Sequence, residues 1–570
     1  MSTKQPTTIF KKALEYSVKR YPLASLFAVL FTFSSIFLNH YGYYLVMINI
    51  AYSLSLGFFL LTAFYHWRRN ISVLIGGLLL IFVFWLLLSI GEYTHTVTIT
   101  KYIISVTIAL LLLVVLPFIE KKYSPLKFVA WILNIFMALT GAIVFGLILF
   151  SSLAGAMSVA TTLFEFRISG KYYMDLFIFI MGLFSTHFFL SLLAKEAHNI
   201  NIAKEFYGRI GKFFVKYILT PITSIYAIVL VVYLLKIFFT LEWPNGILVW
   251  LSLVFALLSL TTYLFWTPFK SKYKKMLLIV ALAQMGMLFF AIYIRVSEYG
   301  WSSSRYLVTM LGIWFVVTFL YLIISKNIRY ELPFALLIIF LFISQYGWKL
   351  SAYDISNQSQ TNRFLKLLKD NSNVSDTSPN KIKCELSRSI EYFWHTYNDE
   401  QFNKMMLKII KNNDYHYKTP QDSLMDFTTK ALGFKYISQW SCQHKKFDTT
   451  RVKIIFKSNY ENKYLDISGY DILYLRPNNH IRTRNRDGKK INLIIVKDDE
   501  KILGEFDIAP LLKKLMSRES DYQHLLEKEE LTFIAENDTI AIKVYFEYLE
   551  VYEETQEVYN SRARLLMRKK

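Results

Sequence analysis

Long apolar runs recur along the first 348 residues of this 570-residue chain and then stop. Each run is about twenty residues long, so a helix rising 1.5 Å per residue can cross the roughly 30 Å hydrocarbon layer of a membrane. The runs are continuous and lack the alternation of a membrane β-barrel. The pattern therefore predicts a polytopic α-helical membrane bundle of about eleven spans, from residues 22–38 to residues 333–348.

The chain after Trp348 has the mixed composition of a soluble protein. Residues 349–380 predict a helix followed by a Ser/Asn-rich linker. The remainder has a helical first half and a second half whose segments alternate as strands do, with Asp487-Gly488 as a turn signal and a helix expected over residues 510–529. We therefore predict three parts, 1–348, 349–380 and 381–570, the last a soluble α+β domain.

Composition and charge agree with a membrane protein and predict its orientation. Hydrophobic residues make up 54% of the chain, and 27 Lys and Arg stand against 10 Asp and Glu in residues 1–348. Loops predicted on one side hold 21 Lys and Arg and those on the other side hold five, and positive residues favour the cytoplasmic side. The sequence thus predicts a cytoplasmic N-terminus and an extracytoplasmic tail, and its net charge of +22 requires no nucleic acid partner.

Residues 295–306, RVSEYGWSSSRY, form a short polar and aromatic link between the ninth and tenth predicted spans. The charged members are expected to form an ion-paired cluster: Arg295, Glu298 and Arg305. The aromatic members suit the headgroup layer or the underside of the tail: Tyr299, Trp301 and Tyr306. We interpret the link as a latch that docks the tail on the bundle, with a ligand site as the alternative.

Neutral polar residues occur within the predicted spans at Asn49, Asn134, His187 and Gln284. Such groups usually make interhelical hydrogen bonds worth about 0.6 kcal/mol each. Among these four, His187 alone titrates near neutral pH. Ionisable residues are scarce inside the spans, which disfavours a transporter coupled to protons or ions.

The two cysteines, Cys384 and Cys442, both lie in the predicted tail. An oxidising extracytoplasmic compartment permits a disulfide between them, worth about 2–4 kcal/mol through its constraint on the unfolded chain. Two separate buried thiols are the alternative, and both interpretations stay open.

The sequence contains no recognisable catalytic, metal or cofactor motif. The tail lacks a GDS-like nucleophile, the first predicted outer loop around His40 has no acid, and no histidine has a second ligand at metal-binding spacing. We therefore predict no catalytic residue, metal or cofactor. The basic segment 476–490 is expected to be a solvated loop between strands, with attraction to anionic lipid or an envelope polymer as the alternative.

Four strings carry a resemblance to a known family: KYILTPITSIYAIVLVVYLLK, EWPNG, IRVSEYGWSSSRY and SNQSQTNRFLKLL. Residues 216–369 resemble a large bacterial family of integral membrane proteins classified only as domain of unknown function 4153. The most specific feature is EYGW followed by RY between two spans. The resemblance implies a multi-spanning bacterial membrane protein, and it implies no reaction, substrate or cofactor.

These observations favour a non-enzymatic scaffold, sensor or assembly module of the bacterial cytoplasmic (inner) membrane that presents an extracytoplasmic binding domain. Its expected partners are membrane lipids and, through the tail, an envelope protein or polymer. The alternative is a transporter or channel for a small or lipidic solute, using a helix kink at Pro221 and the neutral polar residues. A weaker alternative is an outer-leaflet enzyme with Glu298 as acid or base.

Overall fold

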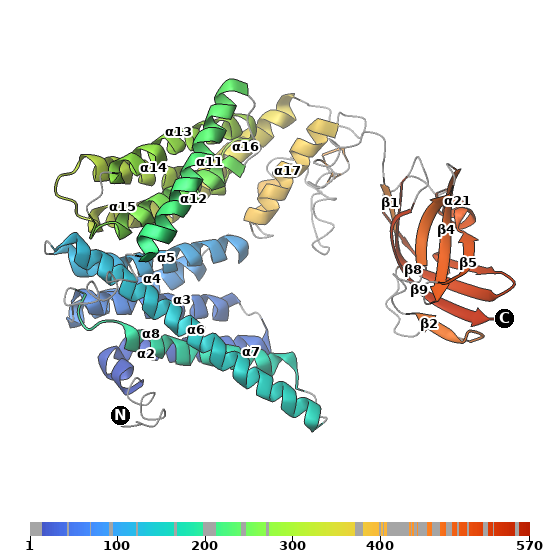
Figure 1. Ribbon diagram of the computed structural model, residues 1–570, viewed down its shortest axis with the longest axis horizontal. Helices are drawn as coiled ribbons and strands as arrows, with labels where there is room; N and C mark the ends of the chain where they lie inside the picture. Colours follow the sequence, from blue (N-terminus) through green and yellow to red (C-terminus); the bar gives the residue numbers. More distant parts are fainter. Residues whose placement is uncertain are drawn as a thin grey trace. The chain divides into compact units, whose positions relative to one another are not determined.

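The protein, seen as a computed structural model, consists of a helical unit, Met1–Tyr436, and a β-rich unit, Ile437–Lys570 (Figure 1). All described membrane-length helices belong to the first unit and all described strands to the second. The structure describes residues 14–42, 45–68, 70–89, 95–120, 123–164, 168–197, 213–240, 247–269, 273–370, 380–397, 401–402, 404–406, 432–434, 436–437, 442, 453–458, 468–474, 481–486, 489–498, 501–516, 523–527, 529–552 and 558–570.

Within the described residues, ten helices are long and apolar enough to cross a membrane. In chain order they comprise α2 (Pro22–Tyr41), α3 (Leu45–Trp67), α4 (Ile71–Ser89), α5 (His95–Ile119), α6 (Pro125–Leu163), α7 with α8 (Gly170–Phe179 and Thr186–Leu192), α11 (Thr220–Thr240), α12 (Ile247–Phe265), α13 (Lys274–Tyr299) and α14 (Ser303–Ile324). Their apolar residues continue around the whole helix, as suits a segment with lipid on one side and protein on the other. The prediction of a multi-pass helical membrane protein is therefore confirmed.

The last apolar helix is α15 (Glu331–Tyr346), and it has only 16 residues. At 1.5 Å per residue it is about 24 Å long, shorter than the hydrocarbon layer. The count of eleven spans therefore depends on α15, and so does the side of the membrane on which the tail lies. Both stay predictions.

Two of the long helices contain π-helical turns. One, η1 (Ile180–Ser185), lies between α7 and α8, and the other, η2 (Phe214–Leu219), leads into α11. Pro221 directly follows η2 inside this continuous helix, where proline lacks the N–H that would otherwise bond a carbonyl of the preceding turn. The irregularity predicted at Pro221 is therefore placed by the structure in the π-helical turn just before it.

Small residues and one buried tryptophan join the helices of the first half. At Gly146 of α6 an added Cβ would lie 2.1 Å from the Ser185 hydroxyl, so only glycine permits this approach of α6 to η1. Trp131 of α6 is fully buried and donates its indole N–H to the Leu113 carbonyl of α5 at 3.0 Å. A glycine of α6 is therefore required for close packing at Gly146, whereas an added Cβ at Gly155 would meet nothing within 4 Å.

After α15 the chain makes the short 3₁₀-helix η3 (Trp348–Leu350) and two polar helices, α16 (Ala352–Asp370) and α17 (Asn380–Thr396). Helix α16 contacts both α14 and α15. The two polar helices share a small apolar core built around Phe364, Leu386, Ile390 and Phe393. They belong to the helical unit.

The β-rich unit contains two sheets. The larger has the order β2-β9-β8-β1-β6, with β7 also paired to β8. Its strands are β1 (Lys453–Ser458), β2 (Ile472–Tyr474), β6 (Gln523–Leu526), β7 (Thr532–Glu536), β8 (Ile540–Tyr552) and β9 (Val558–Lys569). The smaller sheet is β3 (Ile481–Arg486), β4 (Lys489–Asp498) and β5 (Lys501–Asp507), in the order β3-β4-β5. One short helix, α21 (Ala509–Met516), buries Leu511, Leu512 and Leu515 in the core of this unit.

Two predictions for this unit were wrong. The helix expected over residues 510–529 ends at Met516, and β6 follows because Gln523–Leu526 pairs in parallel with β1. The basic segment expected to be a solvated loop contains β3, which pairs with β4 so that Arg486 lies opposite Lys489. In β3 an arginine falls at every second residue, which is the strand period, and the density of charge obscured this alternation.

Candidate functional site

The candidate site is built where α13 ends and α14 begins, within residues 295–306. Gly300 caps α13 with φ of +69°, a conformation that L side chains rarely adopt. Ser302 then caps α14, its hydroxyl accepting a hydrogen bond from the Arg305 N–H at 3.4 Å. These two caps leave the backbone of the intervening link free to bond elsewhere.

One polar face of helix α16 forms hydrogen bonds with the backbone groups of this link. The Trp301 N–H donates to the Ser359 hydroxyl at 2.9 Å. The side-chain amide of Gln360 donates to the carbonyls of Tyr299 at 3.0 Å and Trp301 at 2.7 Å. Ser356 adds a longer bond to the Trp301 carbonyl at 3.4 Å. We call these groups, the Tyr299 and Trp301 backbone with the Ser356, Ser359 and Gln360 side chains, the latch.

Gly300 also permits the close approach of α16. A Cβ added to Gly300 would lie 2.9 Å from the Ser359 hydroxyl and 3.3 Å from the Gln360 amide nitrogen. The side chains of Ser356 and Gln360 are buried at 0% and 6% exposure. Because Ser356 and Gln360 are buried, their hydrogen bonds are costly to leave unmade.

Tyr306 extends the contact to the start of the polar region. Its hydroxyl donates to the Leu350 carbonyl of η3 at 2.6 Å, and its ring lies edge-on to Trp301 at 6.3 Å. The neighbouring Trp348 has φ of +51°, an uncommon conformation for a bulky residue. The chain is therefore held at Leu350 as well as at the latch, just after the end of α15.

Arginine side chains surround Tyr299 beside the latch. The guanidinium carbons of Arg305, Arg363 and Arg388 lie 5.7, 5.8 and 5.7 Å from the centre of its ring. Arg363 also pairs with Glu385 of α17 at 3.2 Å. The site thus combines neutral hydrogen bonds to α16 with a concentration of positive charge from α14, α16 and α17.

The expected ion-paired cluster of Arg295, Glu298 and Arg305 is not among the ion pairs of the described residues. Arg305 instead donates to the Gly300 carbonyl at 2.6 Å, and the Glu298 side chain is exposed. Sequence reasoning also missed the partner surface on α16. Its signal was present, because Ser356, Ser359, Gln360 and Arg363 fall at the i, i+3, i+4 and i+7 positions of one helix face.

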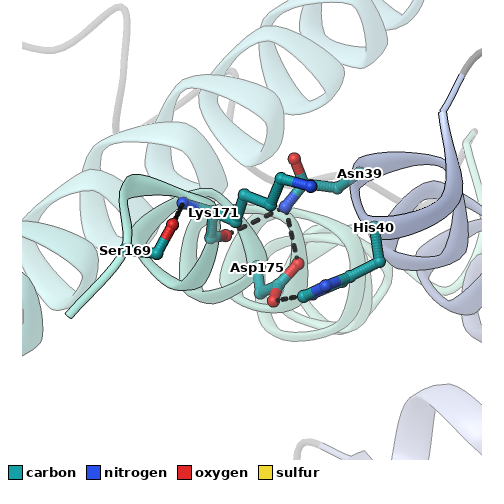
Figure 2. Close-up of polar contacts among 5 residues, drawn as sticks. All are labelled: Asn39, His40, Ser169, Lys171 and Asp175. Carbon is teal, nitrogen blue, oxygen red and sulfur yellow. Dashed lines mark hydrogen bonds and ion pairs between the residues drawn. The ribbon is translucent and has the colours of Figure 1, made fainter.

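A second polar cluster, which the sequence did not predict, joins α2 to α7 (Figure 2). The Asp175 carboxylate contacts the His40 imidazole at 2.6 Å and accepts from the Asn39 amide at 2.8 Å. Asn39 also donates to the Lys171 carbonyl at 2.9 Å, and Ser169 caps α7 through the Lys171 N–H. Since His40 and Asp175 are 135 residues apart, no local spacing could have revealed this cluster.

The predicted intramembrane polar residues differ in their surroundings. The Asn134 side chain accepts from the Ala194 N–H at 2.9 Å and donates to the Leu192 carbonyl, so it joins α6 to the end of α8. His187 bonds its own helix at the Leu183 carbonyl. Asn49 is buried with its amide oxygen unbonded within the described structure, and neither amide atom of the fully buried Gln284 has a hydrogen-bond partner there.

Cys384 and Cys442 are both disulfide-bonded. Among the described residues, no group of three or more His, Cys, Asp and Glu side chains is placed to hold a metal ion. The side chains described at the latch make hydrogen bonds to backbone groups and cation–π contacts to the Tyr299 ring.

Comparisons with known proteins give one result. No curated protein and no solved structure matches the chain. One family does match, over residues 24–364, from the first turn of α2 into α16. The match includes both sides of the latch and stops before α17 and the strands. Since it spans more than half of the 570 residues, the chain belongs to the family described as Domain of unknown function (DUF4153).

Proposed function

We propose that this protein is a non-enzymatic scaffold of the bacterial cytoplasmic membrane, whose helical bundle holds a tail on the extracytoplasmic side as a binding, sensing or assembly module. Its partners in this proposal are membrane lipids and, through the tail, an envelope protein or polymer. The proposal assigns no catalytic residue and no cofactor.

The observation that carries the proposal is the latch. The side chains of Ser359 and Gln360 form hydrogen bonds with the backbone of the link between α13 and α14. A helix bound in this way is fixed to the bundle, and it therefore restrains the position of the chain that follows it. This arrangement suits a holder of a domain better than a site that must admit and release a substrate.

Two observations support an extracytoplasmic tail. Both cysteines are disulfide-bonded, and such bonds persist in oxidising compartments outside the cytoplasm. The excess of Lys and Arg in alternate loops favours the same orientation. Non-reducing mass spectrometry of the protein purified from cells should recover a peptide pair linked through Cys384 and Cys442, and two free thiols would contradict this part of the proposal.

The latch is tested by limited trypsin cleavage at Lys366 and Lys369 of α16 in the purified full-length protein. The double substitution Ser359→Ala with Gln360→Ala removes three hydrogen bonds, each worth about 1 kcal/mol, so we expect a loss of roughly 2–3 kcal/mol in docking. Cleavage should then accelerate by about 30-fold or more, because it follows the open population of α16.

The matched control is Gln358→Ala with Asn362→Ala, two exposed positions on the other side of the same helix. This variant changes the intrinsic helix propensity of α16 to a similar extent and leaves the latch intact. Equal cleavage rates for the two double variants would show that the latch does not hold α16.

A transporter or channel is the second candidate, and Gln284 is the observation that favours it. Its amide is fully buried in α13 with no hydrogen-bond partner in the described residues, as is the amide of Gln345 in α15. A passing solute could use such groups. If the protein is a scaffold, Gln284→Leu should raise its melting temperature and preserve the phenotype that deletion of the gene removes; loss of that phenotype in a well-folded variant would favour transport.

A further inference from the structure

Four arginines from four different helices converge beside the latch. Arg295 comes from α13, Arg305 from α14, Arg363 from α16 and Arg388 from α17. The last three lie within 5.8 Å of the centre of the Tyr299 ring, so no two of their guanidinium carbons can be more than 11.5 Å apart. Arg295 and the other two interact electrostatically with Arg305. The whole group therefore repels itself.

The surrounding acids do not balance this charge. Arg363 has Glu385 as its partner at 3.2 Å, and Glu298 is exposed at the end of α13 beside Tyr299. Among the described residues, Glu385 and Glu298 are thus the two carboxylates found beside these four guanidiniums. Arg305 lies moreover in the first turn of α14, where the helix dipole disfavours a cation.

The neutral groups around these arginines also leave some of the arginine N–H donors without an acceptor. Arg305 donates to the Gly300 carbonyl and Arg363 to the Tyr299 carbonyl. The Nε of Arg388 is buried and has no hydrogen-bond partner in the described structure. A single aromatic ring attracts each cation but accepts no conventional hydrogen bond from this nitrogen. Arginine donors that are close together, partly desolvated and underused are the usual composition of an oxyanion site.

We propose that Arg295, Arg305, Arg363 and Arg388 bind a phosphate-type oxyanion at the junction of α13, α14, α16 and α17. A phosphate group offers more acceptor oxygens than a carboxylate and matches several guanidinium forks at once. The junction lies at the end of the membrane-length helix α13, so a lipid headgroup phosphate and a soluble phosphate present the same chemistry there. The inference deepens the proposed function, because it rests on the same docked position of α16 and makes the anion a clamp between the bundle and α17.

The test uses the full-length protein, delipidated in neutral detergent, and titrates inorganic phosphate at constant ionic strength. We expect the melting temperature to rise with phosphate, because a ligand that binds the folded state stabilises it. In Arg388→Gln the phosphate concentration giving the same rise should increase by roughly tenfold or more, since a charge-assisted hydrogen bond is lost. Arg295→Gln, which removes no described hydrogen bond, serves as the second variant should Arg388→Gln fail to fold.

The matched control is Lys366→Gln, which removes an exposed cation from the same helix as Arg363. It should respond to phosphate as the wild type does. A second arm reconstitutes each protein in nanodiscs of phosphatidylcholine with or without phosphatidylglycerol, and counts retained phosphatidylglycerol by native mass spectrometry. Selective retention lost in Arg388→Gln identifies the lipid headgroup as the source, and a response to inorganic phosphate alone identifies a soluble phosphate.

The proposal is overturned if the wild type responds in neither arm, if the arginine variants bind as the wild type does, or if Lys366→Gln weakens binding equally. Trypsin cleavage at Lys369 is measured on the same samples. If α16 stays protected while phosphate binding is absent, the anion site is refuted and the scaffold proposal stands. If α16 is open in the wild type, the docking on which both depend has failed.

Discussion

The two polar clusters at the helix ends, one around Tyr299 and the other around Asp175, solve different physical problems. Asp175 is satisfied by its immediate neighbours, since His40 and Asn39 each contact one carboxylate oxygen. The Tyr299 region has a satisfied backbone but an excess of arginine, and Arg388 retains an unused donor. A cluster whose polar groups are bonded to one another needs nothing further to be stable, whereas one that leaves a buried donor without a partner points to a ligand.

The comparison also separates short-range from long-range assembly. The Asp175 cluster joins two helices of the bundle and depends on three side chains and one carbonyl. The latch joins the bundle to α16 through hydrogen bonds to backbone groups of the link between α13 and α14. A substitution in the link keeps these backbone groups, so it weakens the latch only if it changes the backbone conformation. The glycine that sets that conformation should therefore matter more than any single side chain in the link.

The largest expected effect concerns the side of the membrane on which both clusters lie. If each apolar helix crosses, the end of α2, the start of α7 and the end of α13 share one side, and the tail is there too. Alkaline phosphatase joined after Trp348 should then be active, and the same enzyme joined after Arg69 should be inactive. A silent fusion after Trp348, with normal expression, would mean that the 16-residue α15 does not cross and that the tail is cytoplasmic.

Gly300→Ala should give the next largest effect, through the backbone. Its φ of +69° costs an L side chain about 1–2 kcal/mol, and the new Cβ would lie 2.9 Å from the Ser359 hydroxyl. We expect a total loss of about 2–3 kcal/mol in docking, seen as trypsin cleavage at Lys366 that is faster by 30-fold or more.

Gly286→Ala is the control for this substitution. Gly286 lies in the same helix, α13, and an added Cβ meets nothing within 4 Å. It should leave cleavage unchanged and stabilise the helix by about 0.5–1 kcal/mol. If Gly300→Ala behaves in the same way, neither the positive φ nor the close approach of α16 is needed for docking.

Asp175→Ala should have a smaller and strictly local effect. It removes the acceptor for Asn39 and His40 in a partly exposed cluster, so about 1 kcal/mol of local stability should be lost. Faster hydrogen exchange in residues 170–179, with no change in cleavage at Lys366, is the expected result.

Lys171→Ala is its control, because the hydrogen bond at Lys171 uses its backbone carbonyl, which the substitution retains, and only the charge attraction of its ammonium for Asp175 is lost. If Asp175→Ala also released α16, the two clusters would be coupled through the bundle, and the contrast drawn between them would fail.

Features that depend on interactions between residues close in the sequence could be predicted, whereas features that depend on residues far apart in the sequence could not. The apolar runs predicted the long helices because membrane burial acts on each segment independently. Residues 295–306 stood out because their polarity contrasts with the flanking runs. Pairings set by tertiary contact were not predictable. They include Asp175 with His40, the parallel pairing that makes Gln523–Leu526 a strand, and the hydrogen bond of Arg305 to the Gly300 carbonyl. The polar face of α16 could be predicted from helical spacing. Its binding partner could not, because that partner is the backbone of the link between α13 and α14, and backbone groups leave no signal in the sequence.

The smallest expected effect distinguishes a scaffold from an enzyme at the same place. Glu298 is exposed, and none of the ion pairs of the described residues joins it to an arginine of the cluster. Glu298→Gln should therefore change stability by less than about 0.5 kcal/mol and leave cleavage at Lys366 as in the wild type. It should also preserve the phenotype that gene deletion removes, because a scaffold does not need a proton donor at this position.

An acid or base acting on a lipid-linked substrate would lose most of its rate when its carboxylate is replaced by an amide. Loss of the phenotype in a normally expressed, trypsin-resistant Glu298→Gln protein would thus overturn the scaffold in favour of chemistry, and would turn the arginines around Tyr299 from a clamp into a substrate-binding group.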